Sequence, residues 1–219
     1  FRLERSHDTA RASDCLVAHP ALLPVLDSIR LTPDVEVTIR TSVATGEIPA
    51  RWDRAQGDVA GLPDTGGVGP TASLHEDVAG HRFRVSAASF FQSGPTGAEL
   101  LVEAVTRAAP ELGTAETVLD AYAGVGLFAL AATPPRASLL TVETSKSAVG
   151  DCRANLEGRH ALIERGEFGS WRPDRGVQID VAIADPARSG LGRPGVGSLV
   201  SADVPVVALV SCDPVALAR

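Results

Sequence analysis

The sequence has few cysteines and no methionine, and the cysteine content narrows the kind of protein it can be. The three cysteines, Cys15, Cys152 and Cys212, lie far apart and are odd in number among 219 residues. A disulfide framework is therefore not expected, and a reducing compartment, the cytoplasm, is the expected location. Cys15 alone cannot hold an iron–sulfur cluster, so we predict no metal site.

Long apolar runs and an excess of basic residues are also missing. No stretch approaches the ~18 consecutive apolar residues of a membrane span, and no basic and apolar leader opens the chain. We therefore expect no membrane partner. The net charge of −7 and the pI of about 5.2 lack the overall basic character that nucleic-acid binding normally leaves. An RNA partner would require a local basic surface or one supplied by another domain.

The absence of methionine even at position 1 leads us to expect that the chain is a piece of a longer protein. Its end at Arg219, close behind a motif that we interpret below as catalytic, supports the same expectation. Hydrophobic residues make up 44% of the sequence, enough for a sizeable core. The sequence gives no indication of the oligomeric state.

Two regions with different patterns divide the chain. Residues 1–84 indicate a small α+β region, with an amphipathic helix over 16–31, strands over 35–44 and 81–86, and a loop over 57–70. In residues 85–219 strands alternate with helices, which predicts an α/β fold with a doubly wound, mainly parallel sheet. The expected strands are 117–122, 138–143, 180–184 and 204–210, the last two buried. The expected helices are 97–109, capped by Thr96, then 127–132 and 145–156.

A glycine-containing turn after the first strand of this second region predicts a cofactor site. Asp120 lies near the end of that strand, and Gly124 and Gly126 allow a tight backbone turn against a ligand. Glu143 ends the next strand, where a carboxylate can accept hydrogen bonds from both hydroxyls of a ribose. Ala129 replaces the third glycine of a dinucleotide-binding fingerprint. We therefore predict a nucleoside cofactor without phosphates; the alternative is an ordinary strand-to-helix turn.

Two further motifs follow the last two expected strands and indicate a reaction site. Residues 185–190 read DPARSG and begin with Asp185, whereas residues 211–214 read SCDP and contain Cys212. Ligands of such sheets bind at the carboxyl ends of the strands, so both motifs are expected beside the cofactor. A cysteine held there is a competent nucleophile. The alternative for a single cysteine is an inert core residue.

Taken together, these motifs resemble the RNA 5-methyluridine methyltransferases, a class I S-adenosylmethionine-dependent family, over about residues 88–219. The resemblance is carried by Phe91-Gln92, the DAYAGVG turn, Glu143, DPARSG and SCDP in this order. It implies S-adenosylmethionine as cofactor and carbon 5 of a uridine in tRNA or rRNA as the methylated atom. It also implies that Gln92, Tyr122 and Glu143 contact the cofactor, that Asp120, Gly124 and Gly126 shape its pocket, that Asp185 lies between cofactor and base, and that Cys212 is the nucleophile.

The chain departs from the family pattern at four positions. Asparagine is expected where the chain has Gly94 and Leu127, a second proline at Ala187, and asparagine at Asp213. Leu127 implies the loss of one polar cofactor contact. Asp213 adds a negative charge beside the proposed thiolate, which disfavours its formation. The family's general base is a glutamate well beyond the nucleophile, and we assign no base in this chain.

Three other functions compete with this interpretation. The same cofactor could serve methylation of another RNA base, although methyltransferases that act on amines usually have Asn-Pro-Pro-Tyr where this chain has residues 185–188. A non-catalytic RNA-binding protein could retain the fold, which the departures at Gly94, Leu127 and Asp213 and the acidic pI favour. A nicotinamide-dependent oxidoreductase would explain neither the DPAR nor the SCDP motif.

Overall fold

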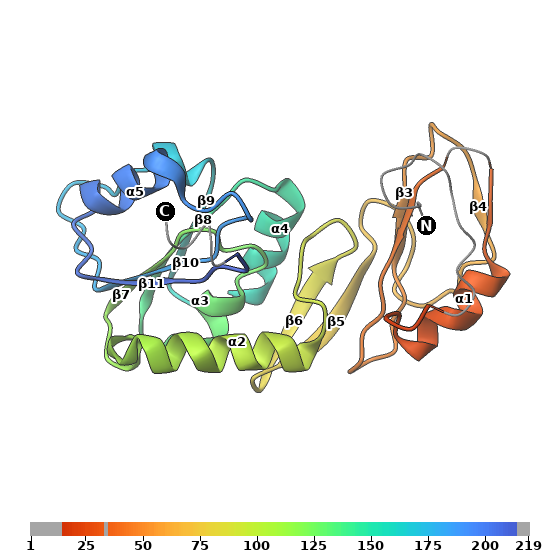
Figure 1. Cartoon of the computed structure of the whole chain (residues 1–219), viewed down its shortest axis with the longest axis horizontal. Helices are drawn as coiled ribbons and strands as arrows, with labels where there is room; N and C mark the ends of the chain where they lie inside the picture. Colours follow the sequence, from red (N-terminus) through yellow and green to blue (C-terminus); the bar gives the residue numbers. More distant parts are fainter. Residues whose placement is uncertain (1–14, 33–34, 214–219) are drawn as a thin grey trace. The chain divides into compact units, whose positions relative to one another are not determined.

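Figure 1 shows the computed structural model, which describes residues 15–32 and 35–213. The chain forms two compact units, one of residues up to 75 together with 86–88, and one of residues 76–85 together with the chain from residue 89 onward. The boundary after residue 84 that the sequence suggests remains a prediction of domain organisation. None of the helices among the described residues has both the length and the apolar character needed to cross a membrane.

The first unit combines one short helix with short antiparallel strand pairs. The 3₁₀ turn η1 (Pro20–Leu22) leads into α1 (Leu23–Ser28). Strand β1 (Arg30–Leu31) pairs with β4 (Val59–Ala60), and β2 (Val37–Ile39) pairs with β3 (Ala50–Trp52). Buried apolar residues hold the unit together, among them Val25, Ile48 and Ala50.

Three sequence predictions in this unit are wrong in extent. The helix expected over 16–31 does not form as one element, since Leu16 and Val17 are 100% and 94% exposed and the helical residues begin at Pro20. Proline suits a helix start because it has no N–H to bond within the first turn. The strand expected over 35–44 is limited to β2, and the loop expected over 57–70 contains β4.

A hairpin of β5 (Ser73–Val78) and β6 (His81–Ser86) follows. Its two-residue turn consists of Ala79 and Gly80, with φ angles of 50° and 78°. Positive φ at both central residues is the turn geometry whose twist matches that of antiparallel strands. The bounds predicted for β6 are confirmed, whereas β5 was not predicted.

The second unit is built on a five-stranded parallel sheet with the order β11-β10-β7-β8-β9. Its strands are β7 (Thr117–Asp120), β8 (Ser138–Glu143), β9 (Ala161–Arg165), β10 (Val181–Ala184) and β11 (Val206–Leu209). The chain moves outward from β7 to β9 and then returns to β10 on the other side of β7. The predicted doubly wound sheet is confirmed, and the β7–β10 junction is its topological switch point, where such sheets bind ligands.

Helices cover the sheet from both sides. They are α2 (Pro95–Ala108), η2 (Pro110–Gly113), α3 (Leu127–Ala131), α4 (Lys146–Asn155), η3 (Phe168–Ser170) and α5 (Gly192–Ser201). Figure 1 shows α2 and α3 on one side of the sheet and α5 on the other. The predicted Thr96 cap of α2 is wrong: Gly94 is the N-cap and Pro95 the first helical residue, the position where proline is favoured.

Burial differs between the last two strands. All four residues of β10 are buried, as predicted, because β10 lies between β7 and β11 and is covered on both faces. The prediction that β11 is buried is wrong, since Val207 and Leu209 are 41% and 39% exposed. In the described sheet β11 is an edge strand, and one of its faces lacks the cover that β10 has.

Candidate functional site

The predicted site residues gather where four parallel strands end. In the strand register, Asp120 of β7 lies opposite Ile183 of β10 and Thr141 of β8. Ala184 of β10 lies opposite Leu209 of β11. Because the strands are parallel, the segments that follow them begin at one edge of the sheet. The structure therefore brings the glycine turn, Glu143, Asp185 and the Cys212 segment to the same edge.

The glycine turn after β7 has a backbone that glycine alone adopts without strain. Gly124 and Gly126 have φ angles of 54° and 88°, and the N–H of Gly126 donates to the carbonyl of Ala123 at 2.7 Å. A Cβ at position 126 would lie 3.2 Å from Sγ of Cys152, on the neighbouring helix α4. The predicted tight turn is therefore present and packs closely against α4 at Gly126, whereas its contact with a ligand stays a prediction.

Glu143 links this turn to the start of α4. Its Oε2 accepts a hydrogen bond from the N–H of Gly124 at 2.9 Å, and its Oε1 accepts one from the N–H of Ser145 at 2.7 Å. The hydroxyl of Thr144 also donates to Oε1 at 3.2 Å. A carboxylate has about four acceptor sites, so the side chain retains capacity for about one further donor. The bonds to backbone groups fix the carboxylate at the strand end, in an orientation compatible with donors such as the hydroxyls of a ribose.

Asp120 is a buried carboxylate whose hydrogen bonding is incomplete. Its Oδ2 accepts from the N–H of Ala129 at 3.1 Å, while its Oδ1 has no hydrogen-bond partner among the described residues. Burial, with smaller contributions from the nearby charges of Asp185 and Glu143, raises the pKa of Asp120 to about 7 despite the lowering effect of the Ala129 bond. Buried polar atoms are nearly always paired, so an unpaired oxygen at this edge fits a polar or cationic ligand.

Tyr122 follows β7 and is held by the loop after β9. Its ring packs edge-on against Phe168 with centroids 5.4 Å apart. Burial, with a smaller effect of Glu167, raises the pKa of the phenol, so the hydroxyl remains a donor at neutral pH. The ring of Tyr122 therefore packs against the hydrophobic core, and its hydroxyl lies beside Gly195 of α5. Its cofactor contact stays a prediction.

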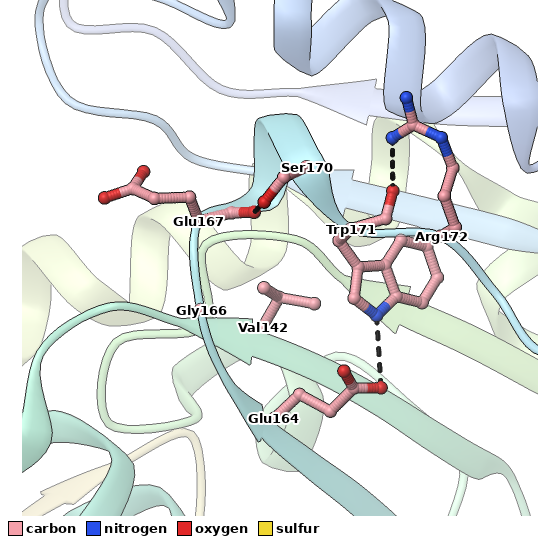
Figure 2. Close-up of a pocket in the computed structure, with 7 residues that line it drawn as sticks. All are labelled: Val142, Glu164, Gly166, Glu167, Ser170, Trp171 and Arg172. Atoms are coloured by element: carbon pink, nitrogen blue, oxygen red, sulfur yellow. Dashed lines mark hydrogen bonds between the residues drawn. The ribbon is translucent and has the colours of Figure 1, made fainter.

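A cavity of about 230 Å³ opens beside the ends of β8 and β9. Figure 2 shows the indole of Trp171 directed at Glu164, with 3.2 Å between its Nε1 and Oε1 of the carboxylate. Arg172 donates to Ser198 of α5 at 2.9 Å, which ties this loop to the helix. The cavity is smaller than the ~300–1,000 Å³ of a whole ligand site, so it suits one part of a cofactor, such as a nucleobase. Its lining residues are Val142, Glu164, Gly166, Glu167, Ser170, Trp171 and Arg172.

The segments after β10 and β11 form the second part of the site. Asp185 is half-buried, and its burial raises the pKa of the carboxyl. The loop that it begins is closed by a 2.8 Å hydrogen bond from Gly190 to the carbonyl of Ala187. Among the described residues Cys212 is exposed, and its role as nucleophile stays a prediction. The hydroxyl of Ser211 accepts from the N–H of Asp213 and donates to its carbonyl, which shapes the bend around Cys212.

Gln92 lies half-buried in the segment between β6 and α2. The ring of its neighbour Phe91 packs 6.1 Å from that of Phe83 on β6. Its cofactor contact stays a prediction.

The sequence did not predict a polar network that joins α4 to β6, to Ser89 and to the glycine turn. Asp151 and Asn155 on α4 bind Arg84, Ser89 and the backbone of the glycine turn. A polar pair four residues apart is the ordinary pattern of a helix surface, so the sequence carries no signal that both groups face inward.

This doubly wound sheet, with a glycine turn after its central strand and an acidic residue ending the neighbouring one, has the Rossmann-like fold of class I methyltransferases. No protein-family model matches the chain. Along its whole length it is 30% identical, over 245 aligned residues, to a protein of Streptomyces avermitilis named an uncharacterized RNA methyltransferase, 55% of which it covers.

A second protein, from Streptomyces coelicolor and also named an uncharacterized RNA methyltransferase, is 38% identical over 143 residues, which are 63% of this chain and 31% of that protein. Among solved structures, the tRNA (uracil-54, C5)-methyltransferase of Pyrococcus abyssi, in complex with S-adenosyl-L-homocysteine, superposes with a TM-score of 0.63 at 23% identity. That match covers 83% of this chain and 50% of the Pyrococcus chain. The chain thus spans about half the length, or less, of these proteins.

Proposed function

We propose that this chain is part of an S-adenosylmethionine-dependent RNA methyltransferase. The names of the two Streptomyces relatives support RNA methylation, and the fold is shared with an enzyme solved with S-adenosyl-L-homocysteine. The observation that carries the proposal is the shared sheet edge, which joins a nucleoside-binding arrangement to a segment with an exposed cysteine.

The residues at the edge fit this cofactor. Glu143 would accept the ribose hydroxyls, and the cavity lined by Val142 and Trp171 would take the adenine. The unpaired Oδ1 of Asp120 gives the site a polar group towards a positively charged ligand. When bound, the cofactor supplies an electrophilic methyl group. Gln92 and Tyr122 are the further contacts that the family resemblance implies, and Gly124 and Gly126 shape the turn.

We propose carbon 5 of a uridine as the methylated atom. Carbon 5 of uracil is a weak nucleophile, and Cys212 overcomes this by adding its thiolate to carbon 6, which turns the ring into an enolate. Carbon 5 of the enolate would then attack the electrophilic methyl group that the bound cofactor supplies, and the demethylated cofactor would be the leaving group. Removal of the carbon 5 proton by a base lets the ring expel the Cys212 thiolate. Asp185, at the neighbouring strand end, would lie between cofactor and base.

The substrate must present its uridine out of the base stack, because carbon 6 is out of reach inside a paired helix. A single-stranded loop or a flipped nucleotide provides this. Transfer RNA and ribosomal RNA are both compatible with such a site.

The test is covalent trapping with RNA that contains 5-fluorouridine. Fluorine cannot leave as a proton, so the reaction stops with the protein bonded to RNA, and a denaturing gel shows a shifted band. We expect the band with the wild-type protein and with Cys15→Ala, and no band with Cys212→Ala. A band that persists in Cys212→Ala would overturn the nucleophile. No band from a wild-type protein that binds both cofactor and RNA would instead favour another RNA base or a non-catalytic role.

A further inference from the structure

One side chain of α4, that of Asn155, binds the backbone of the glycine turn. Its Nδ2 donates to the carbonyl of Val125 at 2.9 Å, in the middle of the turn. The same amide accepts from the N–H of Arg84 at 2.7 Å and donates to the carbonyl of Arg84 at 3.0 Å. Asn155 therefore pairs with both backbone groups of Arg84 on β6, as a residue of a neighbouring strand would. The same side chain also binds the turn that follows β7.

Asp151 lies four residues before Asn155, on the same face of α4. It is fully buried and accepts hydrogen bonds from the guanidinium of Arg84 and from the hydroxyl of Ser89, the latter at 2.5 Å. A buried carboxylate is stable when it is paired in this way. Ser89 lies three residues before Gln92, so Asp151 fixes the segment that carries this predicted cofactor contact.

The glycine turn is consequently held by one side chain that precedes α4 and by one at the end of α4. Glu143, just before the helix, binds the N–H of Gly124, and Asn155, its last residue, binds the carbonyl of Val125. The N–H at the start of the Gly124-Val125 pair and the carbonyl at its end therefore each have a fixed side-chain partner. Residues in and just before α4 thus hold three parts of the proposed site in fixed positions: the turn, Glu143 and the segment of residues 89–94.

We infer that Asn155 and Asp151 are positioning residues for cofactor binding, which hold the glycine turn and the Gln92 segment in the arrangement that the cofactor meets. The inference rests on the proposed function, since it concerns the same site. It assigns no contact with the cofactor to either residue. Their effect is transmitted through Val125 and Ser89.

A matched control exists at the opposite edge of the sheet. Asp180 accepts hydrogen bonds from the N–H groups of Glu116 and Thr117 at 2.8 and 2.9 Å, at the amino end of β7. Asp180 and Asn155 both fix backbone next to β7, but Asp180 does so at the amino ends of β7 and β10, whereas the predicted cofactor residues lie at the carboxyl ends of the strands. Asp180→Ala therefore reports the effect of losing such bonds away from the site.

The experiment measures the affinity of the whole chain for S-adenosyl-L-homocysteine by calorimetry, well below the melting temperature of every variant. We expect Asn155→Ala to weaken binding about tenfold or more, the size of one lost buried hydrogen bond, and Asp180→Ala to change it less than about twofold. Equal affinities of wild type and Asn155→Ala, or equal losses in both variants, would overturn the inference.

A second variant keeps the test decisive if Asn155→Ala does not fold. Ser89→Ala removes one hydrogen bond to Asp151 and leaves Asn155 in place, and we expect a severalfold loss of affinity. Amide exchange of Gly124 and Gly126 should accelerate in Asn155→Ala but not in Asp180→Ala. A wild-type chain that binds no S-adenosyl-L-homocysteine would reject the proposed function itself, which is a different outcome from wild type and variants binding alike.

Discussion

The two halves of the candidate site differ in how they are held. The cofactor half, at the ends of β7 and β8, is tied by bonds between distant parts of the chain, such as Glu143 to Gly124 and Asn155 to Val125. In the reaction half, at the ends of β10 and β11, the bonds at Gly190 and Ser211 close local turns within a few residues. From this difference we expect the cofactor half to be formed before ligand binding and the reaction half to depend more strongly on its local turns.

The largest effect that separates the halves is expected for Cys212→Ala. Loss of the nucleophile should lower methyl transfer to RNA by roughly 10³-fold or more, because the enolate no longer forms. The affinity for S-adenosyl-L-homocysteine should stay within about twofold of wild type. Radiolabel transfer and calorimetry measure the two quantities. A strong loss of cofactor affinity would contradict the separation of the halves.

Asp120 should make folding stability depend on pH. Its pKa is about 7 in the folded protein against 3.8 as the ordinary value, so the folded state binds the proton more tightly. The stability that Asp120 contributes is therefore greatest at low pH, falls as the pH rises from about 4 to 7, and is level above that. The fall amounts to ~4 kcal/mol at most.

Urea unfolding of the wild-type chain and of Asp120→Asn between pH 4.5 and 8 measures this effect. The substitution should flatten the decline, because asparagine keeps the acceptor for Ala129 without a titrating proton. Asp77→Asn is the control, since Asp77 is exposed and its pKa is lowered by Arg82, so it stays ionised throughout this range. A similar pH slope in wild type and Asp120→Asn would count against the account.

A pair of glycines tests the packing of the cofactor half. Gly126→Ala should destabilise the chain by about 1–2 kcal/mol, because the new Cβ meets positive φ and Sγ of Cys152. Gly150→Ala, within α4 with open space around its Cβ, should instead stabilise the chain by about 0.5–1 kcal/mol. Thermal or urea unfolding compares the two. Weakened cofactor binding is expected for Gly126→Ala, and equal effects of the two substitutions would contradict the packing argument.

The smallest effect is expected for Ser211→Ala in the reaction half. Loss of the bonds to Asp213 should lower turnover severalfold, in line with about 0.5–1 kcal/mol for local hydrogen bonds, and leave cofactor affinity unchanged. Ser201→Ala removes a comparable local bond, to Gly197 on α5, and should alter neither quantity. If Ser211→Ala weakens cofactor binding as strongly as turnover, the two halves are not separate.

The sequence predicts the fold well where buried strands and glycines set the pattern. The bounds of β6 and β8 are predicted correctly, as is the turn at Gly124 and Gly126. Strand β9 was missed because it lies at a sheet edge and most of its residues are exposed or half-buried, so it lacks a continuous apolar run. Helix α5 was missed because Gly192, Pro194, Gly195 and Gly197 disfavour a helix on local grounds.

Tertiary packing explains why α5 forms despite its sequence, and why the contacts that position the site residues were not predicted. Helix α5 packs on the loop after β9, where the hydroxyl of Ser198 donates to the carbonyl of Phe168 at 2.7 Å. Neither that contact nor the bonds of Asn155 to Arg84 and Val125 can be read from the local sequence, because the partners lie 30 to 71 residues apart. The family resemblance predicts roles for Glu143 and Cys212, but it does not predict the side chains that position the cofactor half.

The central claim is that the carboxyl ends of β7 and β8 form the cofactor site. The most direct test is a crystal structure of the chain with S-adenosyl-L-homocysteine. The account predicts density over Gly124 and Gly126, with the ribose hydroxyls bonded to Glu143 and the adenine in the cavity beside Trp171. Ligand density at another place, or its absence in crystals grown at a saturating concentration, would contradict it.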